Sequence, residues 1–254
     1  MRIELQHLSK QFGRTRALRD IVLTIAEGSR VALLGPNGSG KSTLLRAVMG
    51  LIDCEGAVLL DGRSPFAKRH EIAAQLAYVP QSAPQWGATV NDIVRTVCSL
   101  RDIPRDRVDV LAGRLGLDTT ALRSRPFRDL SGGMKHKLLI ATALATDASL
   151  FILDEPTASL DAASRALFFQ LLEERAPKAT QVFCSHRFEE IRSRADRLIV
   201  LGEGAIVFDG PVSEYEDYEV VGPRNGGGST AHAGGLAAPM RVAPHDLALV
   251  RSYR

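Results

Sequence analysis

Residues 35–42 combine three glycines with one lysine and two serines in the spacing of a phosphate-binding loop, G-x-x-x-x-G-K-[ST]. In order they are Gly35, Pro36, Asn37, Gly38, Ser39, Gly40, Lys41 and Ser42. Glycines let the backbone turn tightly and point successive N–H groups at an anion. Lys41 adds positive charge for the outer phosphates, and Ser42 offers a hydroxyl to Mg²⁺. The alternative is a glycine-rich turn that matches by chance.

The flanks of this loop favour phosphate binding over a chance match. Residues 30–34 (RVALL) indicate a short buried strand, and residues 42–49 indicate a helix that begins with Ser42 and Thr43 and ends before Gly50. A phosphate bound in the loop would lie at the N-terminus of this helix, where the helix dipole favours an anion. Strand, loop and helix together predict a nucleoside triphosphate site.

A second group of candidate residues ends an apolar strand, Phe151-Ile152-Leu153, with Asp154 and Glu155. Acidic residues at the carboxyl end of a parallel strand are delivered to the ligand crevice of an α/β sheet. We expect Asp154 to hold Mg²⁺ beside Ser42, and Glu155 to face the γ-phosphate and polarise the attacking water. The alternative is that both acids merely solvate a strand end.

The pattern along the rest of the chain predicts the elements that position these residues. Strands are expected at 2–8, 21–26, 30–34 and 57–60, followed by helices at 89–100 and 105–115 with no convincing strand between 85 and 130. Helices at 133–146 and 162–175 then alternate with strands at 150–153 and 181–184, and a hairpin is expected at 196–201 and 205–208. This order predicts an α/β fold with a mostly parallel sheet, an antiparallel β subdomain and a helical subdomain at about 85–147.

Composition excludes several classes of protein. The 254 residues are 45% hydrophobic and 24% charged with a net charge of +3, as in an ordinary globular protein. Cys54, Cys98 and Cys184 lie far apart without metal-ligand spacing, which suits a reducing cytosol. The N-terminus lacks the apolar core of a signal peptide, and the most apolar stretch, 138–153, is too short to span a bilayer. The arginines between 101 and 128 are interpreted as a solvated helical face, so no nucleic-acid partner is expected.

The order of several short motifs carries a resemblance to a known family. The phosphate loop is followed by Gln81 after an apolar strand, by the run Leu130-Ser131-Gly132-Gly133-Met134-Lys135, by Asp154-Glu155, by Ser159-Leu160-Asp161 and by His186. This order resembles the nucleotide-binding subunit of ABC transporters over about residues 2–215, with the core fold of a P-loop NTPase. The resemblance implies an ABC ATPase domain over 1–221. We interpret the Gly-, Ala- and Ser-rich residues 222–239 as a flexible linker, and residues 240–254 as a tail of unassigned structure.

The resemblance also implies roles for residues near the nucleotide in the same subunit. Phe12 stands where an aromatic ring stacks on adenine, Gln81 where a side chain touches Mg²⁺ or the attacking water, and His186 where a ring hydrogen-bonds the γ-phosphate. The alternatives are core packing for Phe12 and a plain surface histidine for His186. The remaining histidines show no spacing that suggests metal: His7, His70, His136, His232 and His245.

In this family two ATP molecules lie between two such domains arranged head to tail. The resemblance therefore implies a homodimer or a pseudo-symmetric dimer in which Ser131, Gly132 and Gly133 bind the γ-phosphate held by the opposite subunit, with Asp161 at the seam. It further implies ATP hydrolysis that powers transport through a separate membrane permease, with the ATPase peripheral on the cytoplasmic face of the membrane.

Position 134 departs from the family pattern, because it is Met where much of the family has Gln. We expect ATP binding in trans to survive, since Ser131 and the following N–H groups still supply donors. Met134 followed by basic residues favours an exporter, with an importer as the alternative. A soluble ABC-type ATPase acting on the ribosome or on DNA, and a regulator that binds nucleotide without hydrolysis, are the other hypotheses. The resemblance implies that the membrane subunits and any binding protein choose the transported substance.

Overall fold

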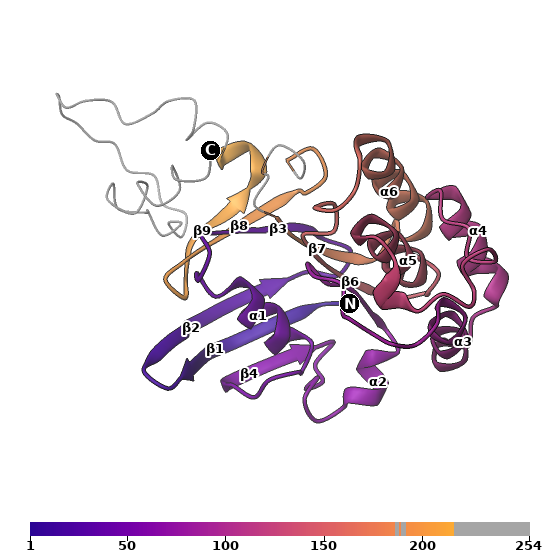
Figure 1. The fold of residues 1–254 in the computed structure, drawn as a ribbon. Helices are drawn as coiled ribbons and strands as arrows, with labels where there is room; N and C mark the ends of the chain where they lie inside the picture. The colour runs from indigo at the N-terminus through magenta and orange to yellow at the C-terminus, as the bar shows by residue number, and fades with distance from the viewer. Residues whose placement is uncertain (186–187, 189–191, 216–254) are drawn as a thin grey trace, which may run out of the picture. The chain divides into compact units, whose positions relative to one another are not determined.

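The computed structural model describes residues 1–185, 188 and 192–215, which divide into two compact units (Figure 1). The helical unit consists of Met1–Arg2, Ala26–Gly28 and Ala67–Val182. The loop unit consists of Ile3–Ile25, Ser29–Phe66 and the described residues from Phe183 on. His186, the predicted linker 222–239 and the predicted tail 240–254 lie outside the described residues.

An antiparallel sheet of three strands in the order β2-β1-β4 forms one part of the loop unit. The strands are β1 (Ile3–Phe12), β2 (Thr15–Ile25) and β4 (Glu55–Leu60). The alternation of buried residues in β1 breaks at His7, which has a φ of 51° and lies within a register shift between Leu5 and Leu8. The strand continues beyond this bulge to Phe12, which is why it is longer than the predicted 2–8.

The other part of the loop unit surrounds the phosphate loop. Its elements are β3 (Arg30–Leu34), α1 (Lys41–Val48), β8 (Arg197–Gly202) and β9 (Ala205–Pro211). β3 pairs with β8 in parallel and β8 pairs with β9 antiparallel, so the predicted final hairpin is present. Helix α1 ends before Gly50, whose φ of 67° suits a helix terminator.

The helical unit contains the remaining elements. They are α2 (Arg69–Ala73), β5 (Leu76–Val79), α3 (Val90–Arg101), α4 (Arg105–Arg114), the 3₁₀ turn η1 (Phe127–Asp129), α5 (Gly132–Leu144), β6 (Leu150–Asp154), α6 (Ala162–Arg175) and β7 (Thr180–Cys184), which ends across the boundary of the unit. β5 and β6 pair in parallel. Helix α5 contacts α4, α6 and β5, and Figure 1 shows it among these helices. The nearly all-buried α5 is thus the centre of this unit.

The arginines between 101 and 128 were interpreted as a solvated helical face, and the structure agrees for Arg114, Arg123, Arg125 and Arg128, which are exposed, but not for the half-buried Arg101, Arg105 and Arg107. Arg101 is half-buried and donates to the carbonyl oxygen of Leu76 at 2.6 Å. Arg107 pairs with Asp147 at 2.9 Å and thereby links α4 to the turn after α5. These guanidinium groups join separate elements because each offers several donors in a fixed plane.

The predicted fold class is confirmed: the chain is α/β, with a mixed sheet, an antiparallel β subdomain and helices. The predicted boundaries of the ATPase domain and of its helical subdomain stay predictions. Helix α2 was missed because a helix of five residues shows almost no periodicity. None of the helices in the described ranges is long and apolar enough to cross a membrane.

Candidate active site

The phosphate loop connects β3 to α1 and depends on glycine at two positions. Gly35 has a φ of 144°, and a Cβ atom there would overlap the carbonyl oxygen of Leu201. Gly40 has a φ of 104°, and a Cβ atom there would overlap the carbonyl oxygen of Ala17. Both positions therefore require glycine for the backbone angle and for the close approach of another chain segment.

The polar atoms of this loop converge on its interior. The Lys41 ammonium donates to the carbonyl oxygens of Gly35 and Pro36, the second at 2.9 Å. Ser39 donates its N–H to Pro36 at 3.0 Å, while its side-chain hydroxyl is buried and has no hydrogen-bond partner among the described residues. A buried hydroxyl without a partner is uncommon in proteins and is a place where a ligand oxygen could be received.

Helix α1 presents an uncapped N-terminus directly after the loop. Gly40 provides no side-chain cap, and the first turn contains no acidic residue. Ser42 is exposed and Thr43 is half-buried in this turn. Because the first N–H groups of a helix have no partner within the helix, this turn fits an anion such as a phosphate.

The aromatic candidate Phe12 lies at the end of β1, just before the turn at Gly13. Phe12 is 49% exposed, so it is not part of the core. The Lys10 ammonium lies 5.3 Å from the centroid of its ring, a cation–π distance. An exposed ring held in this way can stack against a planar base.

In the helical unit, the acidic pair ends the fully buried strand β6. Asp154 and Glu155 are each only 6% exposed, which argues against the alternative that they merely solvate a strand end. Glu155 has a φ of 49°, in the left-handed region that a residue with a side chain rarely adopts. The turn that follows is closed by a bond from the Ala158 N–H to the Glu155 carbonyl oxygen at 3.2 Å. Backbone strain of this kind, about 1–3 kcal/mol, collects at functional sites.

The tip of α5 also offers an N-terminus to an anion. Ser131 caps the helix by accepting a hydrogen bond from the Met134 N–H at 3.2 Å, and both Ser131 and Gly132 are exposed. A Cβ atom at Gly133 would lie 3.2 Å from the carbonyl oxygen of Ser159, so this position is already close-packed. Since Met134 takes part through its backbone, the departure from Gln leaves this capping bond intact.

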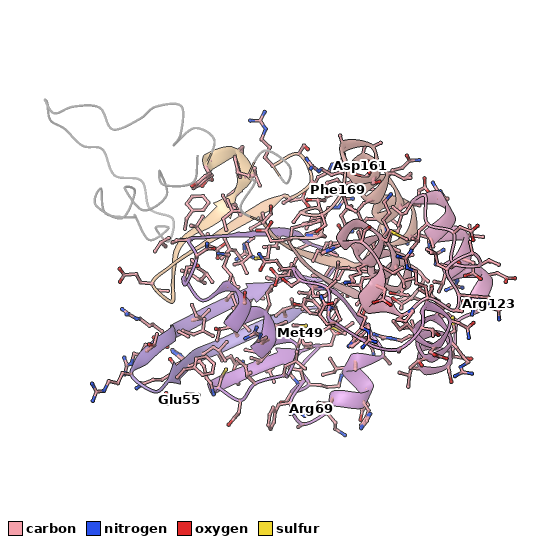
Figure 2. All side chains as sticks on the ribbon, viewed as in Figure 1. Met49, Glu55, Arg69, Arg123, Asp161 and Phe169 are labelled. Atoms are coloured by element: carbon pink, nitrogen blue, oxygen red, sulfur yellow. The ribbon has the colours of Figure 1, made fainter. Side chains whose placement is uncertain are left out.

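Asp161 begins the next helix, α6 (Figure 2). Its carboxylate accepts from the Ser164 N–H at 2.8 Å and from the Ser164 hydroxyl at 3.0 Å. These two hydrogen bonds hold the pKa of Asp161 below its usual value. Asp161 is thus a structural N-cap, whatever else it contacts.

The candidate residues fall into two sets. The loop unit contains Phe12, residues 35–42 and Thr43, and the helical unit contains Gln81, Ser131, Gly132, Gly133, Asp154 and Glu155. Gln81 is exposed and follows β5 by two residues. Within the described ranges no three His, Cys, Asp or Glu side chains gather as a metal site.

Two features of the site were missed from the sequence. The orphaned Ser39 hydroxyl has no signal in a loop motif, where position 39 accepts any residue. His136 was set aside because it lacked metal-ligand spacing, yet it is only 2% exposed, and burial lowers its pKa. A polar residue among the apolar positions of α5 was the signal that could have found it.

Comparisons with known proteins agree with the order of motifs in this chain. The model of the ABC transporter family matches residues 18–158. The sulfate/thiosulfate import ATP-binding protein CysA of Synechococcus elongatus is 33% identical over 266 residues, which cover 96% of this chain and 76% of that protein.

Two solved structures share the fold. An ATP-binding subunit of an ABC transporter has a TM-score of 0.78 at 24% identity, over 85% of this chain and 92% of that one. A bacterial Atm1-family ABC exporter with ATP bound has a TM-score of 0.77 at 25% identity, over 85% of this chain and 39% of that one.

Proposed function

This chain belongs to the ABC transporter family as an ATP-binding subunit that hydrolyses ATP to power transport, and on that premise we propose that it drives an importer of a sulfate-like oxyanion. The structural observation that carries ATP binding is the phosphate loop, in which Gly35 and Gly40 permit the turn and Lys41 lies across it. The proposal of import and of the oxyanion rests on the sulfate/thiosulfate import protein that is similar over nearly the whole chain.

The comparisons correct the prediction of an exporter. That prediction came from Met134, whose contribution to the α5 tip is a backbone N–H that any residue but proline supplies. The similar import protein matches at 33% identity over 96% of this chain, whereas the exporter structure matches at 25% over 85%. Import is therefore favoured.

The phosphate loop would hold the nucleotide through its own subunit. Lys41 would exchange its bonds with loop carbonyls for the outer phosphates, and the N–H groups of residues 38–43 would donate to phosphate oxygens. The exposed ring of Phe12 would stack on the base. These groups form the cis half of the site.

A magnesium ion fits the oxygen-bearing side chains proposed for it: Ser42, Asp154 and Gln81. A hydroxyl, a carboxylate and an amide are hard oxygen ligands of the type that Mg²⁺ prefers. When bound, Mg²⁺ neutralises phosphate charge and orients the transferred phosphoryl group.

Glu155 is proposed as the general base. A buried carboxylate held by a strained turn at the end of β6 can accept a proton from the attacking water with little reorganisation. His186 is proposed to hydrogen-bond the γ-phosphate and stabilise the charge that develops there. Lys41 would stabilise the same charge from the loop side.

The trans half of the site would come from a second ATPase subunit, either another copy of this chain or a homologue. The exposed tip of α5, formed by Ser131, Gly132 and Gly133, supplies N–H donors and the Ser131 hydroxyl without any acidic residue in the first turn. Such a tip suits a γ-phosphate bound by the partner. Closure of the dimer would then depend on ATP.

The transport path would belong to a permease on a separate chain, with this ATPase on the cytoplasmic face of the membrane. The segment after Gln81 is the proposed docking surface, because residues 85–88 are exposed and include Trp86, 44% exposed. Exposed aromatic residues are enriched in protein interfaces. Movement of this segment would couple hydrolysis to the permease.

Reconstitution tests the proposed function. The chain and its permease are placed in liposomes with ATP and Mg²⁺ on the cytoplasmic side, and uptake of labelled sulfate is followed beside phosphate release. We expect sulfate accumulation that requires ATP and that stops in the Glu155→Gln variant. Phosphate release without sulfate uptake would overturn the assignment of the oxyanion but would leave the assignment as an ATPase intact. Absence of phosphate release would overturn both assignments.

A further inference from the structure

The docking segment, residues 85–88, is bonded to the residues that lead into the tip of α5. The Arg128 N–H donates to the Trp86 carbonyl oxygen at 3.0 Å, and the Phe127 N–H donates to the Ala88 carbonyl oxygen at 2.9 Å. All of these residues belong to the helical unit. Main-chain bonds of this kind make the docking segment and its partner move as one piece.

The bonded stretch reaches the tip of α5 within a few residues. Beyond the docking segment the pairing continues at an antiparallel bridge between Thr89 and Pro126. On the other strand of this pairing η1 follows, and only Leu130 separates it from Ser131, the N-cap of α5. The Leu130 N–H donates to the Phe127 carbonyl oxygen at 3.1 Å, which closes the turn. A displacement of the docking segment is therefore passed on to the backbone next to Ser131.

The side chain of Trp86 joins the exposed surface to the interior. Trp86 is 44% exposed, whereas Phe127 is completely buried. Their ring centroids lie 5.3 Å apart with an angle of 38° between the planes, a distance at which aromatic rings attract each other. Because protein interiors are close-packed, a displaced Phe127 ring must displace its neighbours. A partner that contacts the exposed part of Trp86 thus acts on a ring held in the core.

A second attachment links the docking segment to the first turn of α5. The Lys135 ammonium donates to the Gln85 side-chain oxygen at 3.3 Å. The Lys135 N–H donates to the carbonyl oxygen of the Ser131 cap at 2.9 Å. Lys135 is only 8% exposed, and an ammonium so far removed from water depends on its hydrogen-bond partners. The docking segment is therefore fastened to the tip of α5 on both sides of Ser131.

We propose that Trp86 is a positioning residue for the tip of α5, so that a permease segment in contact with Trp86 sets the place of Ser131 through Phe127. The inference rests on the proposed function, in which the permease docks at residues 85–88 and Ser131 receives the partner's γ-phosphate. Coupling between two binding sites is reciprocal. A γ-phosphate that reaches the tip should therefore change the surroundings of Trp86.

Intrinsic fluorescence tests this reciprocal effect, because Trp86 is the only tryptophan of the chain. ATP with Mg²⁺ is titrated into Glu155→Gln, which should hold the nucleotide without rapid hydrolysis, and into Glu155→Gln combined with Ser131→Arg, whose tip is blocked. We expect the tryptophan emission to shift with ATP in the first protein and to stay constant in the second. An equal shift in both proteins would overturn the link to the tip, and so would no shift while light scattering shows that a dimer has formed.

A variant of Phe127 tests the route. Phe127→Leu keeps an apolar side chain but removes the ring that contacts Trp86. In the Glu155→Gln background it should reduce the shift in emission by about twofold or more, because the contact between the rings is lost. An undiminished shift would show that Trp86 responds by another route, such as direct contact with the partner subunit, and would overturn the role of Phe127.

Hydrogen exchange without nucleotide gives a readout that does not need hydrolysis. In Trp86→Ala the amides of residues 127–135 should exchange about twofold to tenfold faster than in wild type. Trp86→Phe keeps a ring beside Phe127 and should restore slow exchange. Leu100→Ala is the matched control, since Leu100 is an apolar residue of α3 in the same unit and is 77% exposed. Equal exchange of these amides in Trp86→Ala and Leu100→Ala would overturn the positioning role.

Kinetics separate positioning from a loss of stability. At saturating ATP, kcat should fall about threefold to tenfold in Trp86→Ala and recover in Trp86→Phe, because the trans tip is displaced in the first variant only. The Kd of the isolated chain for ATP should stay within about twofold of wild type, since the phosphate loop belongs to the loop unit. A fall in kcat that Trp86→Phe does not reverse, or an equal loss of ATP affinity, would contradict the positioning role.

The two proposals fail in different ways. Wild-type protein that releases no phosphate contradicts the proposed function, and the exchange of residues 127–135 still decides on Trp86. Wild-type protein that hydrolyses ATP, with these amides unaffected by Trp86→Ala, contradicts the positioning role alone.

Discussion

The ammonium of Lys41 donates to the carbonyl oxygen of Pro36 at 2.9 Å and so spans the phosphate loop of which it is part. The loop therefore carries its cation in place before any phosphate arrives. Loop carbonyls are weaker partners for an ammonium than phosphate oxygens, because a phosphate oxygen carries negative charge and adds a Coulomb attraction that a neutral carbonyl lacks. Exchange of one for the other provides the driving force for binding.

Lys41→Ala should weaken ATP binding by about tenfold to a hundredfold, because a charged hydrogen bond to phosphate contributes about 1.5–3 kcal/mol. Isothermal titration with ATP measures the change. Lys178→Ala is the matched control, since Lys178 is an exposed lysine outside the loop unit. Equal affinities of the two variants would contradict the role of Lys41.

Gly40→Ala should destabilise the protein by about 1–3 kcal/mol and abolish ATP binding, because the new Cβ overlaps the carbonyl oxygen of Ala17. Gly38→Ala is a control for backbone angle, since Gly38 has a φ of 85° but no heavy atom within 4 Å of the added Cβ. It should lose only about 1 kcal/mol. Urea unfolding measures both; if the two substitutions destabilise equally, steric fit at Gly40 is not the cause.

Glu155→Gln should bind ATP with unchanged affinity and hydrolyse it about 10²–10⁴ times more slowly, because the amide keeps the shape of the carboxylate but cannot accept the proton. Single-turnover phosphate release under saturating ATP measures the chemical step. Glu203→Gln is a control at a residue that is exposed in the β8–β9 turn and shares the positive φ, 46°. Wild-type turnover in Glu155→Gln would remove Glu155 as the base.

The capping box of α3 predicts a dependence of stability on pH. The Thr89 hydroxyl donates to Asp92 at 2.7 Å, and this bond is the main reason that the pKa of Asp92 is lowered. Because the folded-state pKa is below the unfolded value, the contribution of Asp92 is present above about pH 4 and is lost as the pH falls through the folded-state pKa. Thr89→Ala should lose about 1 kcal/mol at pH 7 and show a flatter decline in stability below pH 4. Parallel declines in the two proteins would contradict this account.

Local signals explain which parts of the fold could be predicted. The strand, loop and helix over 30–49 were predicted within one residue, because an apolar run, three glycines and the terminator Gly50 lie together. The end of β1 was missed, since the bulge at His7 shifts the alternation and its partner strands supply the pairing. Thr89 was placed inside α3 but caps it, an ordinary error of one residue at a helix end.

In the candidate site, too, the features set by local sequence could be predicted and those set by tertiary packing could not. The residue types of the loop, the acidic pair and the α5 tip were identified from spacing, since each motif is contiguous. The left-handed backbone of Glu155 could not be predicted, because glutamate does not favour that conformation and the surrounding buried turn imposes it.

The central claim is that each ATP site takes its phosphate loop from one subunit and its α5 tip from the other. Mixing two inactive variants tests this most directly: Lys41→Ala lacks a working loop, and Ser131→Arg blocks the exposed tip. A mixed dimer then contains one complete site, formed by the intact loop of the Ser131→Arg subunit and the intact tip of the Lys41→Ala subunit. Random pairing would restore about a quarter of the wild-type sites. We predict ATP hydrolysis in the mixture far above that of either variant alone. A mixture as inactive as its components, while both variants remain folded, would contradict the shared site.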